Sequence, residues 1–303
     1  MPSTEPRRSA ATRIALAAAL IALLAGCAAG GREPESDERG LGPAERVAAL
    51  LEGRYSGTVS GAQGGARVRV DAAVERIAAE GVFVRLDQTR GDEPARSFRL
   101  LFQPTRVATR LSGRFAPLDA AGAAIGACPL TVSVRSDGFV ASTDAATCRF
   151  GQDDGARALV KEIAHDGQRL VIADRIVDVD SGSPVGDDRV LELHRVRTFT
   201  GWSGVRDDAA SAWRVSQPLQ VRSDGSEHRP VDAAGVPLGF LLELAPHRVR
   251  PDEPPVLRLR VFDERSGALL AQSWAEPGLG RLGVALPELQ VGLRAAAPRG
   301  RSR

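Results

Sequence analysis

The feature that most constrains the fold is an alternation of apolar and polar side chains that recurs along the chain after Gly53. Alternation with a period of two residues is typical of strands with one buried and one exposed face. Turn-forming pairs such as Asp137-Gly138 separate the runs, and Asp-Gly between alternating runs favours a hairpin. The runs lie at residues 67–71, 82–86, 98–102, 107–111, 130–135, 156–163, 169–173 and 190–195.

Many short antiparallel strands in sequence order predict an up-and-down barrel, because closing the sheet removes its exposed edges. We therefore expect an all-β protein in which residues 44–197 form a calycin- or lipocalin-like antiparallel β-barrel. A barrel of about eight to ten strands can hold one small ligand. One helix is expected before the strands, since Pro43 stands in its first turn and Gly53 follows its end. Its apolar residues Val47, Leu50 and Leu51 share one face, which should pack against the sheet.

The strands continue after Thr198 with looser spacing, and residues 198–294 are expected to form a smaller β domain of sandwich type. Prolines interrupt the middle of this region, and residues 295–303 are basic and are predicted to be a disordered tail. The candidate strands cover residues 198–205, 212–221, 236–244, 256–262, 268–274 and 281–286.

The first 26 residues have the pattern of an export signal. Three arginines precede an uninterrupted apolar run at residues 14–24, which is shorter than the roughly 20 residues of a membrane-spanning helix. The following Leu24-Ala25-Gly26-Cys27 has the pattern of a bacterial lipobox. We expect cleavage before Cys27 and lipidation of its thiol; an ordinary signal peptide that happens to contain a cysteine is the alternative.

Lipidation at Cys27 would make the membrane a partner of the mature protein through its acyl chains. Residues 27–43 are small, charged and poor in apolar side chains, which predicts a flexible tether. Ala28 follows the cysteine, and a residue other than Asp at this position points to the outer membrane in a Gram-negative cell. The predicted location is therefore the cell envelope, at the periplasmic face of the outer membrane.

The two remaining cysteines, Cys128 and Cys148, form an even pair in an oxidising compartment and are expected to be joined by a disulfide. A metal site or reactive thiols are the alternatives, but no histidine or further cysteine stands beside either residue. No metal site is predicted. The net charge of +2 does not favour nucleic-acid binding.

The four histidines lie far apart in the sequence. His165 and His228 occur in turn-like stretches and are expected to be solvated, whereas His194 is expected to be a hydrogen-bonded barrel residue. The chain lacks a Gly-x-Ser-x-Gly elbow, a phosphate-binding loop and a His-Glu-x-x-His pair. These observations give a hydrolase or a metalloenzyme little support.

Several short motifs occur in an order that matches a known family. They are Leu50 to Tyr55, Phe83 to Gln88, Ala95 to Arg99, Ala127-Cys128, Asp137-Gly138-Phe139, Thr143 to Cys148 and Asp174-Arg175. Taken together, residues 45–196 resemble the CpcT/CpeT-type chromophore lyases, which are small calycin-like barrels that help to attach bilins to phycobiliprotein cysteines. The resemblance covers about half of the chain and implies a barrel that accommodates a bilin-like tetrapyrrole.

Five charged residues are candidates for contacting such a ligand. Arg96 and Arg99 are suited to propionate-like carboxylates, because a guanidinium binds a carboxylate through two hydrogen bonds. Asp87 is suited to ring nitrogens, and Asp174 with Arg175 to closing the rim. The alternatives are the solvated face of an alternating strand for the first three residues and a structural ion pair for the last two.

Three functions follow as hypotheses, in this order. The first is a ligand-binding lipoprotein that binds a hydrophobic or tetrapyrrole-like molecule without catalysis. It comes first because Asp87, Ala95 and Ile176 replace the family's Glu, Tyr and Gly. The second is a chromophore lyase, as the resemblance implies. The third is an envelope protein-interaction module with a barrel filled by side chains. An apolar, filled interior favours the third, and a cavity reached by Arg96 and Asp87 favours the first two.

Overall fold

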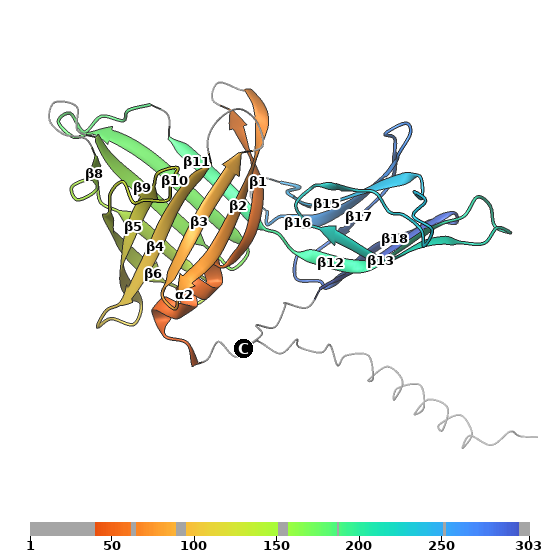
Figure 1. Ribbon diagram of the computed structural model, residues 1–303, viewed down its shortest axis with the longest axis horizontal. Helices are drawn as coiled ribbons and strands as arrows, with labels where there is room; N and C mark the ends of the chain where they lie inside the picture. The colour runs from red at the N-terminus through yellow and green to blue at the C-terminus, as the bar shows by residue number, and fades with distance from the viewer. Residues whose placement is uncertain are drawn as a thin grey trace, which may run out of the picture. The chain divides into compact units, whose positions relative to one another are not determined.

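The computed structural model describes residues 40–61, 65–88, 95–150, 157–186, 188–250 and 253–296 (Figure 1). The chain divides into two units, residues 1–41 and 42–303, and the second unit contains every element described below. The predicted export signal, the lipidation site at Cys27 and most of the tether and tail lie outside the described residues. No helix of the described part has the length and apolar character needed to cross a membrane.

Ten strands of the described residues close into an antiparallel barrel, which confirms the all-β class and the barrel (Figure 1). Each of the ten pairs with the next along the chain, and the ring closes where Tyr55 lies opposite Arg195. The strands are β1 Gly53–Gly61, β2 Gly65–Ala78, β3 Gly81–Gln88, β4 Arg96–Pro104, β5 Arg110–Leu118, β6 Cys128–Val134, β7 Phe139–Thr143, β9 Arg157–His165, β10 Arg169–Asp178 and β11 Arg189–Arg195, with β8 Arg149–Phe150 added beside β9.

The two-residue alternation decides which side chains enter the barrel. On β4, Phe98, Leu100 and Phe102 are buried, while Arg99 and Leu101 between them are exposed. Inward side chains from the barrel strands and the helix form one apolar core. Full burial of a Leu or Phe side chain contributes about 1.5–3 kcal/mol relative to leaving it exposed, so this core is the main source of the barrel's stability.

The predicted helix is present as α2 Pro43–Leu51 and contacts β2, β3 and β4 at one end of the barrel (Figure 1). The Glu45 carboxylate accepts a hydrogen bond from the Gly42 backbone N–H at 2.9 Å, which satisfies one of the free donors at the helix start. Its buried face is formed by Ala44, Val47, Ala48 and Leu51, and Leu50 is only half-buried.

After the barrel the chain forms two four-stranded antiparallel sheets, with strand orders β13-β12-β19-β18 and β14-β15-β16-β17. Buried side chains from both sheets form a second apolar core. The strands are β12 Thr198–Val205, β13 Arg214–Arg222, β14 Glu227–His228, β15 Phe240–His247, β16 Val256–Asp263, β17 Leu269–Ala275, β18 Arg281–Ala285 and β19 Leu289–Ala295. The sequence analysis missed β14 and β19 and placed the start of β15 four residues too early.

Candidate functional site

A cavity of about 470 Å³ lies at one end of the barrel. Its apolar wall comes from the end of β3, the start of β4, the end of β5 and the first half of β9. The polar lining includes Arg96, Lys161 and Asp174. The main apolar lining residues are Leu86, Phe98, Phe115, Pro117, Leu118 and Leu159.

The cavity lies at the end of the barrel away from α2. At the α2 end, the Tyr55 hydroxyl donates a hydrogen bond to the Leu51 carbonyl at 2.8 Å. A series of aromatic contacts then leads from Tyr55 through His165 and Phe139 to Phe102 near the end of β4. A strand rises about 3.3 Å per residue, so Arg96 stands about 20 Å along β4 from Phe102. We call the α2 end the sealed end and the cavity end the open end.

Lys161 is the central polar residue of the open end. It is the only lysine among 40 basic residues, and its inward position on β9 leaves it only 4% exposed. Its ammonium pairs with the Asp174 carboxylate and lies 5.0 Å and 4.9 Å from the ring centroids of Phe98 and Phe115. Lysines are rarely buried without a partner, and here a carboxylate and two aromatic faces replace water.

The charges around Lys161 affect its protonation. Burial lowers its pKa, because removing the ammonium from water disfavours the charged form. Asp174 opposes this shift, and the positive charges of Arg96 and Arg189 add to it. Arg189 lies directly opposite Asp174 on the neighbouring strand β11. Among the described residues, one carboxylate and two further cations therefore act on the ammonium of Lys161.

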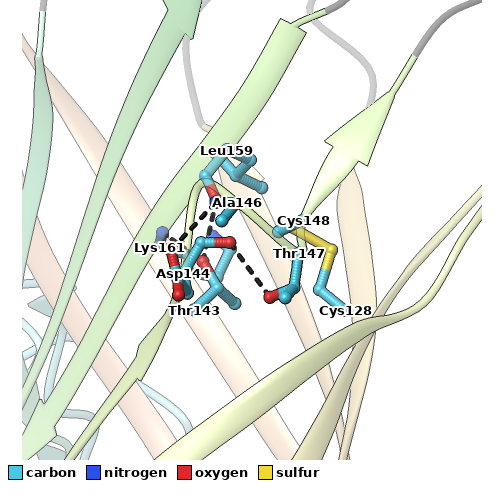
Figure 2. Close-up of a disulfide and its surroundings, with 8 residues drawn as sticks. All are labelled: Cys128, Thr143, Asp144, Ala146, Thr147, Cys148, Leu159 and Lys161. Carbon is cyan, nitrogen blue, oxygen red and sulfur yellow. Dashed lines mark hydrogen bonds between the residues drawn. A yellow bond between two sulfur atoms is a disulfide. The ribbon is translucent and has the colours of Figure 1, made fainter. Parts of the chain in front are cut away.

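A hydroxyl group fixes the backbone that carries Lys161. The β7–β9 ladder ends where Ser142 lies opposite Glu162. Beyond it, the Thr143 hydroxyl accepts a hydrogen bond from the Lys161 N–H at 2.8 Å and donates one to the Leu159 carbonyl at 2.8 Å (Figure 2). The side chain of Thr143 thus takes the place of a strand partner and holds Lys161 in register.

The predicted disulfide joins Cys128, the first residue of β6, to Cys148 (Figure 2). The two Cα atoms are 4.8 Å apart. The Cys148 carbonyl accepts a hydrogen bond from the Leu159 N–H at 3.0 Å. The disulfide therefore connects β6 to the same part of β9 that Thr143 holds, close to the cavity.

Of the five predicted ligand contacts, the structure places Arg96 and Asp174 in the cavity lining. Arg96 lies on the same side of β4 as the buried Phe98, and Asp174 lies on the same side of β10 as the buried Ile172. The two residues come from β4 and β10, which the barrel brings to the same cavity.

The other three predicted residues do not line the cavity. They lie on the outward side of their strands and contact other protein groups on the outside of the barrel. Asp87 accepts hydrogen bonds from Arg85 at 2.9 Å and 3.1 Å. Arg99 donates to the Gly122 carbonyl at 3.3 Å, and Arg175 pairs with Asp188.

The sequence analysis did not single out Lys161 as a site residue. Two signals in the sequence point to it. It is the only lysine in a chain that otherwise uses arginine, and it lies two residues before Ile163 in the same apolar phase of the run at residues 156–163.

The prediction that His165 is solvated is wrong. It is the last residue of β9, is 4% exposed and lies within the sealed end. Its Nδ1 accepts a hydrogen bond from the Gly167 N–H at 3.0 Å, so the neutral ring carries its proton on Nε2, which donates to the Tyr55 hydroxyl at 3.1 Å. Burial lowers the pKa of His165 to about 4, and the positive charge of Arg195 adds to the shift.

Arg195 completes the sealed end. Its guanidinium donates to the Tyr55 hydroxyl at 2.7 Å, to the Glu52 carbonyl at 2.7 Å and to the Leu50 carbonyl. Burial raises the pKa of Tyr55 to about 12, although Arg195 opposes this shift. The phenol is therefore neutral and donates to the Leu51 carbonyl. These groups satisfy backbone carbonyls at the helix end, which is a structural role.

In comparisons with known proteins, no family model matches the chain and no curated protein matches it. Evidence for a function therefore comes from the open end itself. An apolar wall that also carries the basic side chains of Arg96 and Lys161 suits an apolar molecule with an acid group.

Proposed function

We propose that the barrel binds a small, largely apolar ligand with an acid group at its open end and does so without catalysis. A bilin-like tetrapyrrole with propionate groups is one such molecule. The observation that carries this proposal is a cavity of about 470 Å³ in which the only lysine of the chain is buried against two phenylalanine rings.

The shape and the wall of the cavity support an apolar ligand body. Small-ligand pockets commonly have volumes of about 300–1,000 Å³ and apolar linings with a few convergent polar groups. Here the polar groups converge from β4, β9 and β10, while the phenylalanines and leucines of β3 to β5 provide the wall. A ligand that enters would cover the exposed parts of these side chains and release water from them.

The charges support an acid group on the ligand. The basic side chains of Arg96 and Lys161 both line the cavity, and Lys161 is buried there in an ion pair with Asp174. The other acid in the lining, Asp119, already accepts hydrogen bonds from the Ala121 and Ala123 N–H groups at 2.9 Å. A ligand carboxylate would accept hydrogen bonds from these basic groups, and charge-assisted hydrogen bonds are worth about 1.5–3 kcal/mol each.

The proposal includes the setting of this barrel. We infer a calycin-like barrel that is related to the CpcT/CpeT-type lyases, a C-terminal domain of sandwich type and an envelope lipoprotein anchored through Cys27. Incorporation of a labelled fatty acid in cells tests the anchor. The label should be present on the wild-type chain and lost in Cys27→Ser, and equal labelling of both chains would contradict the anchor.

A titration with biliverdin, followed by visible absorbance and circular dichroism, tests ligand binding. We expect a saturable red shift with induced circular dichroism. Arg96→Gln and Lys161→Met should each weaken binding about tenfold, which corresponds to about 1.4 kcal/mol. The matched control is Arg99→Gln, since Arg99 lies on the same strand but points outward, and it should bind like the wild type.

Two results would contradict the proposal. One is an unchanged spectrum at about 100 µM biliverdin together with no binding of a long-chain fatty acid, which would leave the protein-interaction hypothesis. The other is equal weakening by Arg96→Gln and Arg99→Gln, which would show that the contact does not depend on the cavity.

A further inference from the structure

We infer a second binding site, for an acidic polysaccharide, on the outer face of the sheet β13-β12-β19-β18. This face has a shallow hollow of about 720 Å³ with Trp202 in its lining. The site is independent of the barrel cavity, because all its residues belong to β12, β13, β18 and β19.

The first observation is an aromatic platform. Trp202 is 39% exposed and lies opposite Gly292 on β19, which in turn lies opposite Gly283 on β18. A Cβ atom on Gly292 would come within 2.8 Å of the indole Nε1, and one on Gly283 would come within 2.4 Å of the Val291 carbonyl. The indole therefore lies over Gly292, and the backbone leaves no room for a side chain at Gly283, so the sheet stays flat beneath and beside the half-exposed ring.

The second observation is a pair of like charges. Arg281 lies directly opposite Arg294 in the β18–β19 ladder, and both are exposed. Like charges directly opposite in an antiparallel pair destabilise it. Within the part of the chain that the structure describes, neither guanidinium has a carboxylate partner. A bound anion would remove this repulsion through charge-assisted hydrogen bonds.

The third observation is the row that continues from the two arginines. Arg294 lies opposite Thr200, and Thr200 lies opposite Gln220 on β13. Both of these side chains are exposed and provide neutral hydrogen-bond donors and acceptors. The face therefore combines an aromatic ring, hydroxyl and amide groups, and two cations.

This combination fits a sugar ring that carries an acid group. The C–H face of a pyranose stacks on an indole, its hydroxyl groups suit Thr200 and Gln220, and a carboxylate suits Arg281 and Arg294. A single-stranded nucleic acid is the alternative ligand, because such proteins stack bases on aromatic side chains, and the comparison with an oligothymidylate below tests it.

The test is isothermal titration of the purified full chain with a galacturonate hexamer at low salt. We expect saturable binding with a Kd on the order of 100 µM and much weaker binding of a neutral glucose hexamer. Trp202→Ala should weaken binding about tenfold, and Trp202→Phe should restore part of it, because exposed aromatic anchors dominate such interfaces. The double change Arg281→Gln with Arg294→Gln should remove the salt dependence.

Two controls separate this site from other parts of the protein. Trp274 is 44% exposed on β17 in the other sheet, and Trp274→Ala should leave binding unchanged. Lys161→Met, in the barrel, should also leave it unchanged. Absence of binding at about 5 mM hexamer, equal binding of the neutral hexamer, full binding by Trp202→Ala or tighter binding of an oligothymidylate would each overturn the inference.

Discussion

The two ends of the barrel both bury polar side chains, but they use them differently. At the sealed end, Tyr55, His165 and Arg195 bond to one another and to the carbonyls at the end of α2. Of the side-chain polar atoms of these three residues, the Nε atom of Arg195 is the one that is buried without a hydrogen-bond partner. At the open end, Lys161 meets one carboxylate beside a cavity of about 470 Å³.

This difference separates structure from function. A buried polar group whose partners are all protein groups stabilises one conformation, and little room remains for a ligand. A buried charge with a single partner and an adjacent cavity retains the capacity to bind another group. Buried polar groups therefore have a structural role at one end and support the proposed ligand binding at the other.

Arg195→Met should have the largest effect on stability. The change removes one hydrogen-bond donor from each of two backbone carbonyls and from the Tyr55 hydroxyl, in a partly buried site. The free energy of unfolding should fall by about 4 kcal/mol, because several buried groups lose partners at once. Urea denaturation measures this loss. A loss below about 1 kcal/mol would contradict a structural role for the sealed end.

Removal of the disulfide should cost somewhat less and should act on the open end. Replacing Cys128 and Cys148 together with serine releases a loop whose ends are 20 residues apart, and chain entropy gives about 3 kcal/mol for such a loop. Biliverdin affinity should also fall, because the bond holds the strand segment that carries Lys161. Unchanged affinity in the double variant would show that the cavity does not depend on the disulfide.

The sealed end should make stability depend on pH. His165 has a pKa of about 4 in the folded protein and 6.5 as its ordinary value, so the unfolded chain binds more protons between these pH values. The contribution of His165 to the free energy of unfolding is therefore fully present above pH 6.5. It is lost as the pH falls towards 4, at up to about 1.4 kcal/mol per pH unit. Denaturation midpoints at several pH values should show a steeper loss for the wild type than for His165→Gln. Parallel curves would contradict this assignment.

The smallest effect on stability is expected at the open end. Lys161→Met removes a buried charge and keeps the side-chain length, and replacing a buried ion pair with apolar groups is often close to neutral. The free energy of unfolding should change by about 1 kcal/mol or less, since Asp174 remains 26% exposed to water. Asp174→Asn should cost more than Lys161→Met, because it leaves the buried ammonium without its carboxylate. Equal costs for the two variants in urea denaturation would contradict this difference between the partners.

The alternation of side chains predicted most of the barrel because burial on one face of a strand is a local property. It did not reveal β1, whose sequence Gly53–Gly61 is rich in glycine and small polar residues. This strand is defined by its pairing with β2, which follows it, and with β11, which is distant in the chain. The strand β7 is short, and its two partners β6 and β9 similarly define it.

The alternation phase also holds information about the site that the sequence analysis did not use. Arg99 stands between Phe98 and Leu100, and a residue between two inward side chains points outward. His165 follows Ile163 by two residues and therefore shares its inward phase. The pairing of Lys161 with Asp174 could not be predicted in this way, because it depends on the register between β9 and β10.

The only lysine of the chain allows a direct test of the account. Lysine labelled with ¹³C and ¹⁵N places its side-chain label at Lys161 alone, and its Cε–Hε signals report the open end. Biliverdin is added while visible absorbance measures binding in the same sample. We predict a saturable shift of this signal that follows the absorbance change. Binding by absorbance without any change at Lys161 would contradict a ligand site at the open end of the barrel.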